Sequence, residues 1–260
     1  MKEEIQIGIV GGTRGMGKWF ADYLTGQGCR VQAAGRTSGM TISEMAASCE
    51  VVVVSVPISV TVHIINEIGP LLPAESLFMD LTSLKAAPVA AMTVSSAAAV
   101  IGCHPLFGPQ VASLENQHVV LCPVRPGKWL PWLTDMLANG GALLTETTPQ
   151  RHDEFMAIVQ GLNHFNTIMM GLALGKIASP LAELVPFTTP FFNEKLKMIE
   201  KIFAQNPQLY AEIICANQQM AEILPIYEQV LGEVKSFVLR GDAEGLTTVL
   251  QQEAGRLWPE

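Results

Sequence analysis

The stretch Ile9-Val10-Gly11-Gly12-Thr13-Arg14-Gly15-Met16-Gly17 decides the fold class of this 260-residue chain. The apolar run Ile5–Val10 leads into it, and Lys18–Gln27, which has the apolar spacing of a helix, follows it. A strand, a glycine-rich turn and a helix in this order open a βαβ unit. The glycines fit the spacing G-x-x-x-G-x-G, in which Arg14 takes the middle glycine position of the usual G-x-G-x-x-G motif.

The glycine turn predicts a binding site for a dinucleotide. A helix N-terminus offers free N–H groups and a positive dipole to a pyrophosphate, and glycines let the backbone approach the phosphates. We expect contacts from the whole turn, namely from Gly11, Gly12, Thr13, Arg14, Gly15, Met16 and Gly17. The alternative is a tight structural turn that binds nothing.

The end of the second predicted strand, Arg30–Ala34, indicates which dinucleotide is bound. An acidic residue at this point binds the ribose 2′-OH of NAD, but this chain has Arg36-Thr37-Ser38 there. The guanidiniums of Arg14 and Arg36, with the two hydroxyls, suit a 2′-phosphate, because arginine binds phosphate through two parallel hydrogen bonds. The sequence therefore predicts NADP as cofactor, with NAD and a solvated Arg36 as the alternative.

Short apolar runs alternate with helical patterns over the first 150 residues. Further strands are predicted at Glu50–Val56, Ser76–Leu81, Ala98–Gly102, His118–Cys122 and Ala142–Thr145. Helices are predicted at Thr41–Cys49, with Thr41 as N-cap, and at Thr61–Leu72. Right-handed crossovers between such strands build a doubly wound parallel sheet. We therefore predict a Rossmann-type α/β domain that binds NAD(P) over residues 1–150.

The pattern changes after about residue 150. Every later segment has apolar residues at a 3.6-residue period, without a run of β-branched residues typical of a strand. These segments are Arg151–Ile177, Leu181–Leu184, Asn193–Ala204, Pro207–Arg240 and Asp242–Gln252. We predict an all-α domain over residues 151–260, whose wide apolar stripes form a core first and an interface second.

Composition excludes several classes of protein. Hydrophobic residues make up 49% and charged residues 15%, which excludes a disordered chain. The net charge of −8 argues against a nucleic-acid-binding protein, which needs a basic face. Mean hydropathy is +0.31, but the most apolar stretches, Val51–Ile58 and Ile168–Leu174, are shorter than the roughly 18 residues of a membrane span. Five scattered cysteines and the charged start predict reduced thiols in the cytoplasm, with no metal site.

Three polar segments lie where a substrate could meet the nicotinamide: Asp80–Lys85, Gly102–Pro109 and Gln160–Phe165. The first two follow strands, at the carboxyl edge where ligands bind in open α/β sheets. His104 stands between a strand and a Pro/Gly-rich loop, and a neutral imidazole there can take a proton near neutral pH. The alternative is a structural histidine in a loop.

Other side chains in these segments have two interpretations each. Ser83 could hydrogen-bond the substrate hydroxyl or the nicotinamide, or could cap a helix. Lys85 could bind an anion or could be solvated. His164, among apolar residues, is a core histidine by default, and His152 with Asp153 begins a helix as a capping or orienting residue.

The residues quoted above resemble those of the prephenate dehydrogenase family of tyrosine biosynthesis, over nearly the whole chain. The segments His104–Pro109 and Phe203–Ile213 carry the most specific part of this resemblance. The resemblance is carried by Ile9–Gly12 with Gly17, Val54–Ile58, Asp80–Lys85, His104–Pro109, His152-Asp153, Gln160 to Phe165, and Phe203–Ile213.

The resemblance implies an NAD(P)-dependent oxidative decarboxylation of prephenate to 4-hydroxyphenylpyruvate. The family histidine that matches His104 accepts the proton of the 4-hydroxyl, the serine that matches Ser83 assists it, and the histidine that matches His164 helps to hold the substrate. By the same resemblance we expect Val56 and Pro57 at the cofactor, and Gln160 and Tyr210 at the substrate. The long helices imply a homodimer, in which Tyr210 lies near the partner's site.

One departure from the family pattern bears on the substrate. The family commonly has an arginine after its Ser/Thr-Pro turn, where it pairs with a substrate carboxylate, but this chain has Asn193 after Thr188–Phe192. Lys195 or Lys197 could replace the arginine. Arogenate and 4-amino-4-deoxyprephenate therefore stay alternative substrates. We expect no fused chorismate mutase or regulatory domain, so that any inhibition by tyrosine acts at or near the active site.

Two further functions stay open. One is an imine or hydroxy-acid reductase with the same two-domain plan. The other, from a different class, is a non-catalytic NADP-binding sensor that uses its helical domain to bind a protein partner. The joint presence of Ser83, His104 and His164 argues against the sensor, which needs none of them.

Overall fold

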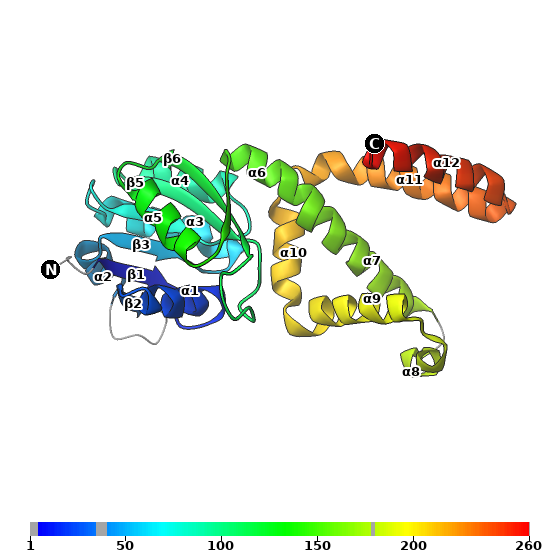
Figure 1. Cartoon of the computed structure of the whole chain (residues 1–260), viewed down its shortest axis with the longest axis horizontal. Helices are drawn as coiled ribbons and strands as arrows, with labels where there is room; N and C mark the ends of the chain where they lie inside the picture. Colours follow the sequence, from blue (N-terminus) through cyan, green and yellow to red (C-terminus); the bar gives the residue numbers. More distant parts are fainter. Residues whose placement is uncertain (1–4, 35–40, 178–179, 260) are drawn as a thin grey trace. The chain divides into compact units, whose positions relative to one another are not determined.

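The computed structural model describes residues 5–34, 41–177 and 180–259. Its internal contacts divide the chain into two units, residues 1–217 and 218–260, which are described one at a time. The first unit contains a β-sheet and, after it, a series of helices (Figure 1). The second unit is a pair of helices, α11 (Met220–Arg240) and α12 (Ala243–Leu257).

The sheet has seven strands in the order β2-β1-β3-β4-β5-β6-β7. Strands β1 to β5 are mutually parallel, and the direction of the connections reverses between β1 and β3. This arrangement confirms the predicted doubly wound sheet. Its strands are β1 (Gln6–Val10), β2 (Arg30–Ala34), β3 (Val51–Val54), β4 (Leu77–Asp80), β5 (Ala99–Pro105), β6 (His118–Arg125) and β7 (Leu143–Glu146).

Helices cover both faces of the sheet. One apolar core contains residues of α1 (Gly15–Gly26) and α5 (Trp129–Asn139), and the other contains residues of the remaining three helices. These are α2 (Ile42–Ser48), α3 (Ile58–Ile68) and α4 (Ala86–Ser95). Because β3 lies between two covered faces, all four of its valines are fully buried, as its unbroken apolar sequence predicts.

The last two strands depart from a wholly parallel sheet. Strand β6 pairs antiparallel to β5, and β7 then pairs parallel to β6. Residues 106–117, which join β5 to β6, contain no helix, and a parallel pair needs a longer crossover than such a loop provides. The sequence also did not indicate α4 and α5 as separate helices, since alanines and prolines blur the apolar period of these segments.

Local signals were more reliable at the start of α2. The Thr41 hydroxyl accepts a hydrogen bond from the Glu44 N–H, and the Glu44 carboxylate accepts one from the Thr41 N–H at 2.8 Å. This reciprocal pair is a capping box, in which two of the unsatisfied N–H groups of the helix end find partners. The predicted N-cap at Thr41 is therefore confirmed.

The helices that follow the sheet form the rest of the first unit. Helix α6 (Pro149–Met156) continues through a π-helical turn, η2 (Ala157–Leu162), into α7 (Asn163–Lys176). Among the described residues, α8 (Leu181–Leu184), a 3-10 turn η3 (Val185–Phe187), α9 (Pro190–Glu200) with a second π-helical turn, η4 (Lys201–Gln205), and α10 (Pro207–Ala216) follow. The single helix predicted over Pro207–Arg240 is wrong, because the chain leaves the helix at Asn217 and α11 begins at Met220.

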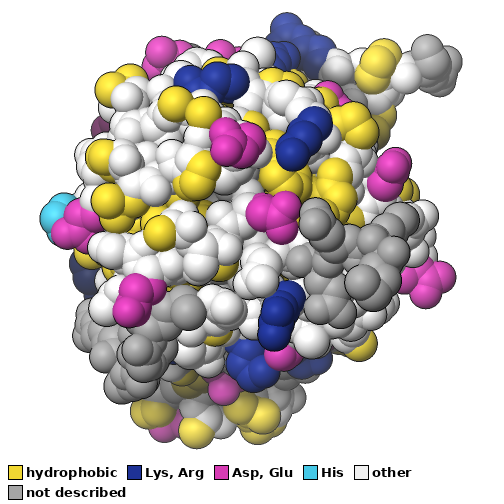
Figure 2. Space-filling view, turned by 90° about the vertical axis from the view of Figure 1, so that its left-hand side faces the viewer, with side chains coloured by type: hydrophobic (Ala, Val, Ile, Leu, Met, Phe, Trp, Pro, Cys, Tyr) yellow, Lys and Arg dark blue, Asp and Glu magenta, His cyan; other side chains and the backbone are white. Residues whose placement is uncertain are grey.

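Two observations concern protein classes considered in the sequence analysis, namely membrane-spanning and nucleic-acid-binding proteins. Within the described ranges no single helix is long and apolar enough to cross a bilayer, although the bent pair Pro149–Lys176 and Leu181–Phe187 reaches the required length and composition. On the face drawn in Figure 2, Lys and Arg side chains are interspersed with Asp and Glu side chains.

The glycine turn yields a stability prediction. Gly11 has φ +85°, and a Cβ there would lie 2.1 Å from the backbone oxygen of Ser55. We expect Gly11→Ala to lower the free energy of unfolding by more than the about 1–2 kcal/mol that a left-handed backbone alone costs an alanine. Urea unfolding followed by circular dichroism measures the change.

Gly26→Ala is the matched control, because a Cβ at Gly26 meets no atom within 4 Å. We expect its unfolding midpoint to equal or exceed that of the wild type, since alanine restricts the unfolded chain. Equal midpoints for the two variants would contradict the close approach of Gly11 to Ser55.

Candidate active site

The functional segments gather at one edge of the sheet. Because β1, β3, β4 and β5 are parallel, the residues that follow them all lie at the carboxyl edge. These residues are the glycine turn, Ser55–Pro57, Leu81–Lys85 and the end of β5 with His104. In open α/β sheets ligands bind at this edge, where the strand order reverses.

The glycine turn fits a dinucleotide. Gly11 lies against the Ser55 carbonyl, and a Cβ at Gly17 would lie 2.4 Å from the Gly11 oxygen, so the turn and the start of α1 approach closely without side chains. The first turn of α1 contains no acidic residue. An anion at its N–H groups would therefore meet the positive helix end without repulsion from a carboxylate.

The other predicted cofactor residues are placed as follows. Arg14 is the N-cap residue of α1, and Thr13, Arg14 and Gly15 are exposed, whereas Gly12 is buried and Met16 is half-buried. Val56 and Pro57 follow β3, and Pro57 is the N-cap of α3. Arg36, Thr37 and Ser38 lie outside the described residues.

Asp80 and Lys85 form a fully buried ion pair below this edge. Asp80 ends β4, and its Oδ2 accepts hydrogen bonds from the Lys85 ammonium and from the backbone N–H of Thr82 at 3.0 Å. The ammonium also donates to the carbonyl oxygen of Cys103 at 2.9 Å. The pair thus ties the end of β4 to the residue that precedes His104.

This arrangement corrects the prediction that Lys85 binds a substrate anion. Its side chain has no exposed surface, and its ammonium is held by Asp80 and Cys103. A buried charge is stable only with such partners, because the interior does not solvate it. Lys85 therefore serves the structure beneath the site.

His104 belongs to a chain of hydrogen bonds that ends at a helix N-terminus. Its Nδ1 lies 2.9 Å from Nε2 of His152, and Nδ1 of His152 lies 2.7 Å from Oδ1 of Asp153. Asp153 accepts the backbone N–H groups of Lys85 and Ala86 at 2.8 and 2.9 Å. Strand β5, helix α6 and the start of α4 thereby meet at one point.

Burial keeps the imidazoles of His104 and His152 neutral. His104 is 3% exposed and His152 is 1% exposed. Desolvation lowers the pKa of His104 well below 6.5, and the electrostatic interactions with His152 and with the Lys85 ammonium lower it further. Desolvation also lowers the pKa of His152, against the opposing effect of its hydrogen bond to Asp153. A neutral His104 can accept a proton at pH 7.

Ser83 lies in the loop between β4 and α4 and is half-buried. In the part of the chain that the structure describes, no hydrogen bond joins Ser83 to His104, so its assisting role stays a prediction.

A second aromatic pair lies on the helices. His164 on α7 and Tyr210 on α10 make an edge-to-face contact, with ring centroids 4.8 Å apart. Gln160 belongs to the π-helical turn one turn before His164, and its Oε1 is buried without a partner among the described residues. Extra-wide π turns often occur at functional sites. Two expected substrate residues, His164 and Tyr210, are thus in contact.

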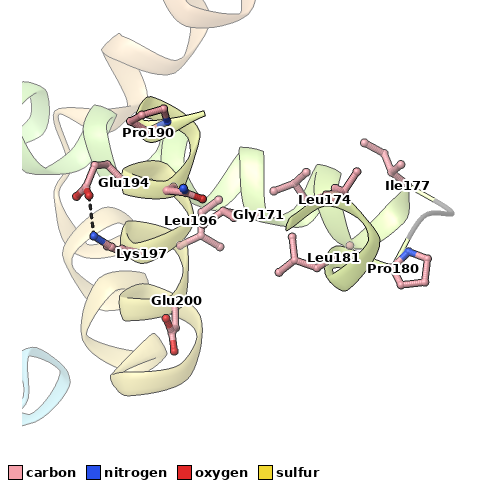
Figure 3. A pocket seen from close by; sticks show the side chains of 14 residues that line it. Gly171, Leu174, Ile177, Pro180, Leu181, Pro190, Glu194, Leu196, Lys197 and Glu200 are labelled. Carbon is pink, nitrogen blue, oxygen red and sulfur yellow. Dashed lines mark hydrogen bonds and ion pairs between the residues drawn. The ribbon is translucent and has the colours of Figure 1, made fainter. Parts of the chain in front are cut away.

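Asn193 and Lys195 lie elsewhere on the helices. Asn193 lines a groove of about 1240 Å³ between α7, α8 and α9 (Figure 3). Lys195 lies over the ring of Phe191, and Lys197 pairs with Glu194 at 2.7 Å. Within the described ranges, no hydrogen bond connects Asn193 or Lys195 to His104 or His164. Their roles at the substrate stay predictions.

Comparisons with known proteins agree with this geometry. Residues 27–146 match the family described as prephenate dehydrogenase, nucleotide-binding domain, and residues 148–252 match prephenate dehydrogenase, dimerization domain. The chain belongs to the prephenate dehydrogenase family. Two relatives and one solved structure illustrate how similar the members are.

A probable arogenate/prephenate dehydrogenase of Methanocaldococcus jannaschii is 35% identical over 96% of this chain and 60% of its own length. A protein of Haemophilus influenzae named T-protein is 35% identical over 92% of this chain and 64% of its own length. The chain thus spans less than two thirds of these relatives. The crystal structure of A. aeolicus prephenate dehydrogenase with hydroxyphenyl propionate and NAD+ superposes with a TM-score of 0.78 at 19% identity, over 98% of both chains.

Sequence reasoning missed the hydrogen bonds of three carboxylates that join elements of the first unit. The sequence indicates Asp80 only as part of the segment Asp80–Lys85, and Asp153 only as a capping or orienting residue. Glu212 on α10 was not singled out either, although its Oε1 accepts a hydrogen bond from the Ser59 hydroxyl at the start of α3 at 2.8 Å. An acid that ends a buried strand signals Asp80, but the partners of Asp153 and Glu212 are 67 and 153 positions away.

The buried ion pair generates a stability prediction. We expect Lys85→Met to lower the free energy of unfolding by about 3–5 kcal/mol, because it leaves the Asp80 carboxylate buried without its cation. Adding Asp80→Asn should recover part of the loss. Denaturant unfolding of the single and double variants measures both effects.

Lys18→Met is the control, since the pair of Lys18 with Asp22 is more than half exposed. Exposed pairs contribute about 0–1 kcal/mol. A loss for Lys85→Met no larger than that for Lys18→Met would refute the structural role of the buried pair.

Proposed function

We propose that this family member catalyses the NAD(P)-dependent oxidative decarboxylation of prephenate to 4-hydroxyphenylpyruvate. The observation that carries the proposal is His104, a neutral base at the carboxyl edge of the sheet with one ring nitrogen bound to His152. Its other nitrogen, Nε2, has no hydrogen-bond partner among the described residues. It can therefore accept the proton of the substrate 4-hydroxyl.

The residues of the chain orient the substrate and remove its proton. When bound, the nicotinamide supplies the acceptor for the hydride that leaves C4. His104 Nε2 takes the hydroxyl proton while the ring carboxylate departs as CO2, and the aromatic product makes the step favourable. Ser83 hydrogen-bonds the same hydroxyl, and His164, Gln160 and Tyr210 hold the substrate, so the protein contributes mainly orientation and a base.

The proposed cofactor is NADP. Arg14 at the start of α1 is exposed, and Arg36, Thr37 and Ser38 follow β2 in the sequence where an acid would favour NAD. Arginines suit the 2′-phosphate of NADP. Val56 and Pro57, which follow β3 at the switch point, would also contact the cofactor.

The proposed substrate is prephenate, with arogenate and 4-amino-4-deoxyprephenate as alternatives. These compounds undergo the same reaction at the ring and differ in their polar groups. Asn193 stands where the family commonly has arginine, and an amide offers neutral hydrogen bonds in place of an ion pair. Asn193 and Lys195 are the side chains by which we expect the substrate carboxylates to be distinguished.

We also propose a division of labour and a homodimer. Residues 1–150 bind the dinucleotide, and residues 151–260 bind substrate and the second copy; the two family matches, which meet between residues 146 and 148, support this division. In the second unit, α11 exposes an apolar stripe of Ile226, Val230, Val234 and Val238. Such a stripe is typical of an interface. The free cysteines favour a reducing compartment, the cytoplasm.

The first prediction concerns His104. We expect reduced-nicotinamide absorbance to grow with prephenate and NADP, and His104→Asn to lower kcat by about 10²–10⁴-fold, the usual contribution of a general base. Because burial lowers the pKa of His104 below 6.5, the wild-type kcat/KM should hold its value to below that pH before protonation removes the base.

His63→Asn is the control, because His63 is exposed beside Glu67 on α3. It should leave kcat unchanged. A panel of prephenate, arogenate and 4-amino-4-deoxyprephenate identifies the substrate, and activity on none of the three refutes the proposed function.

The second prediction concerns the cofactor. We expect a higher kcat/KM with NADP than with NAD, and Arg36→Asp should reverse the order, because a carboxylate repels the 2′-phosphate and accepts a hydrogen bond from the ribose hydroxyl of NAD. Steady-state kinetics with each cofactor measures this. A wild-type preference for NAD, with a nearly silent Arg36→Asp, is the contrary result.

A further inference from the structure

We propose that His152 and Asp153 are positioning residues that fix the tautomer of His104, so that its Nδ1 carries the proton and its Nε2 is the free base. The role of that base in turnover rests on the proposed function. The tautomer itself is a property of the free protein and is measurable without substrate or cofactor.

The chain of hydrogen bonds has a defined direction because it begins at a carboxylate. Asp153 places Oδ1 on the N–H of Lys85 and Oδ2 on the N–H of Ala86, at the start of α4. Both carboxylate oxygens thus accept backbone N–H donors at the positive end of the helix. An ionised carboxylate only accepts hydrogen bonds, so Nδ1 of His152, 2.7 Å away, must donate.

The next link follows from the neutral state of His152. A neutral imidazole carries one N–H. In His152 this N–H is on Nδ1, where it donates to Asp153. Nε2 of His152 therefore presents a lone pair to Nδ1 of His104 at 2.9 Å, and Nδ1 of His104 must donate. The remaining nitrogen of His104, Nε2, then carries the lone pair that a base needs.

The opposite direction would require a cationic His152. Its Nε2 would then donate to His104, and the proton of His104 would move to Nε2, which would remove the base. Desolvation of the buried His152 ring is the largest effect against this state, because it lowers the pKa of His152. The Lys85 ammonium also repels a second cation. Asp153 and Asp80 favour the charge, but Asp80 is already paired with the Lys85 ammonium.

The same chain stabilises the product of proton transfer. When Nε2 of His104 forms its new N–H bond with the proton of the substrate hydroxyl, the ring becomes a cation with two N–H groups. Its Nδ1–H still donates to His152, whose own N–H donates to Asp153. The negative carboxylate therefore acts on the new charge through one neutral ring, with no second proton transfer.

The test combines spectroscopy of the free protein with two variants of matched size. With ¹⁵N-labelled histidine, long-range nitrogen–proton correlation spectra at pH 7.5 should show His104 in the Nδ1–H form, assigned by loss of its signals in His104→Asn. In His152→Gln the side-chain amide can donate to Asp153 and accept from His104, which preserves the direction. His152→Leu fills a similar volume but offers no acceptor.

We expect His152→Gln to keep the Nδ1–H form and most of kcat. His152→Leu should lose that tautomer and lower kcat by about 10²-fold, the low end of what a general base contributes, with a smaller change in KM. An Nε2–H form of His104 in the wild type overturns the proposal, and this measurement does not depend on either variant folding. The proposal is also overturned if His152→Gln and His152→Leu show the same tautomer of His104 and the same kcat.

The proposed function can fail separately. If the wild type shows the Nδ1–H form but turns over none of the three cyclohexadienyl compounds, the positioning role stands and the assigned reaction falls.

Discussion

The carboxylate of Asp153 accepts the N–H groups of Lys85 and Ala86 at the start of α4, a helix whose N-cap residue, Lys85, provides no side-chain cap. The start of this helix is therefore completed by a residue from α6, 67 positions further along the chain. The backbone oxygen of Asp153 also accepts a hydrogen bond from Asn217, after α10. Asp153 thus links α6 to the start of α4 and to the residue after α10, and the hydrogen bonds that run from His104 through His152 end on it.

A second constraint is the buried ion pair of Asp80 and Lys85. Asp80 and Lys85 are buried without exposed surface, and the Lys85 ammonium reaches the carbonyl of the residue before His104. Buried polar groups in a medium of low dielectric are costly when unpaired and rigid when fully paired. The site is therefore held by two linked networks, a charged pair beneath β4 and β5 and a histidine chain that ends on α4. Rigid support of this kind is what a general base needs to meet a substrate hydroxyl at the right distance.

Sequence reasoning succeeded where local physics decides the outcome. The valines of β3, the glycine turn, the capping box at Thr41 and the 3.6-residue period of the later helices each carry their own signal. It failed where distant partners decide. The direction of β6 depends on the strand with which it pairs. The break after α10 has no clear signal in the local sequence. The predicted contact of Lys85 with an anion is wrong, because the local sequence does not show that its side chain is fully buried and that its ammonium reaches the Cys103 carbonyl, 18 positions away.

The sequence by itself determined the doubly wound sheet, the dinucleotide turn, the helical second part and the position of His104 at the carboxyl edge. These follow from periodicity and from the conformations that glycine and threonine favour, which act within a few residues. Only the tertiary structure decided what surrounds His104. Its partner His152 lies 48 positions away, and the direction of their hydrogen bond depends on a carboxylate held by a third element. Contacts between distant segments form only when the chain is folded, so the surroundings of His104 are a property of the fold.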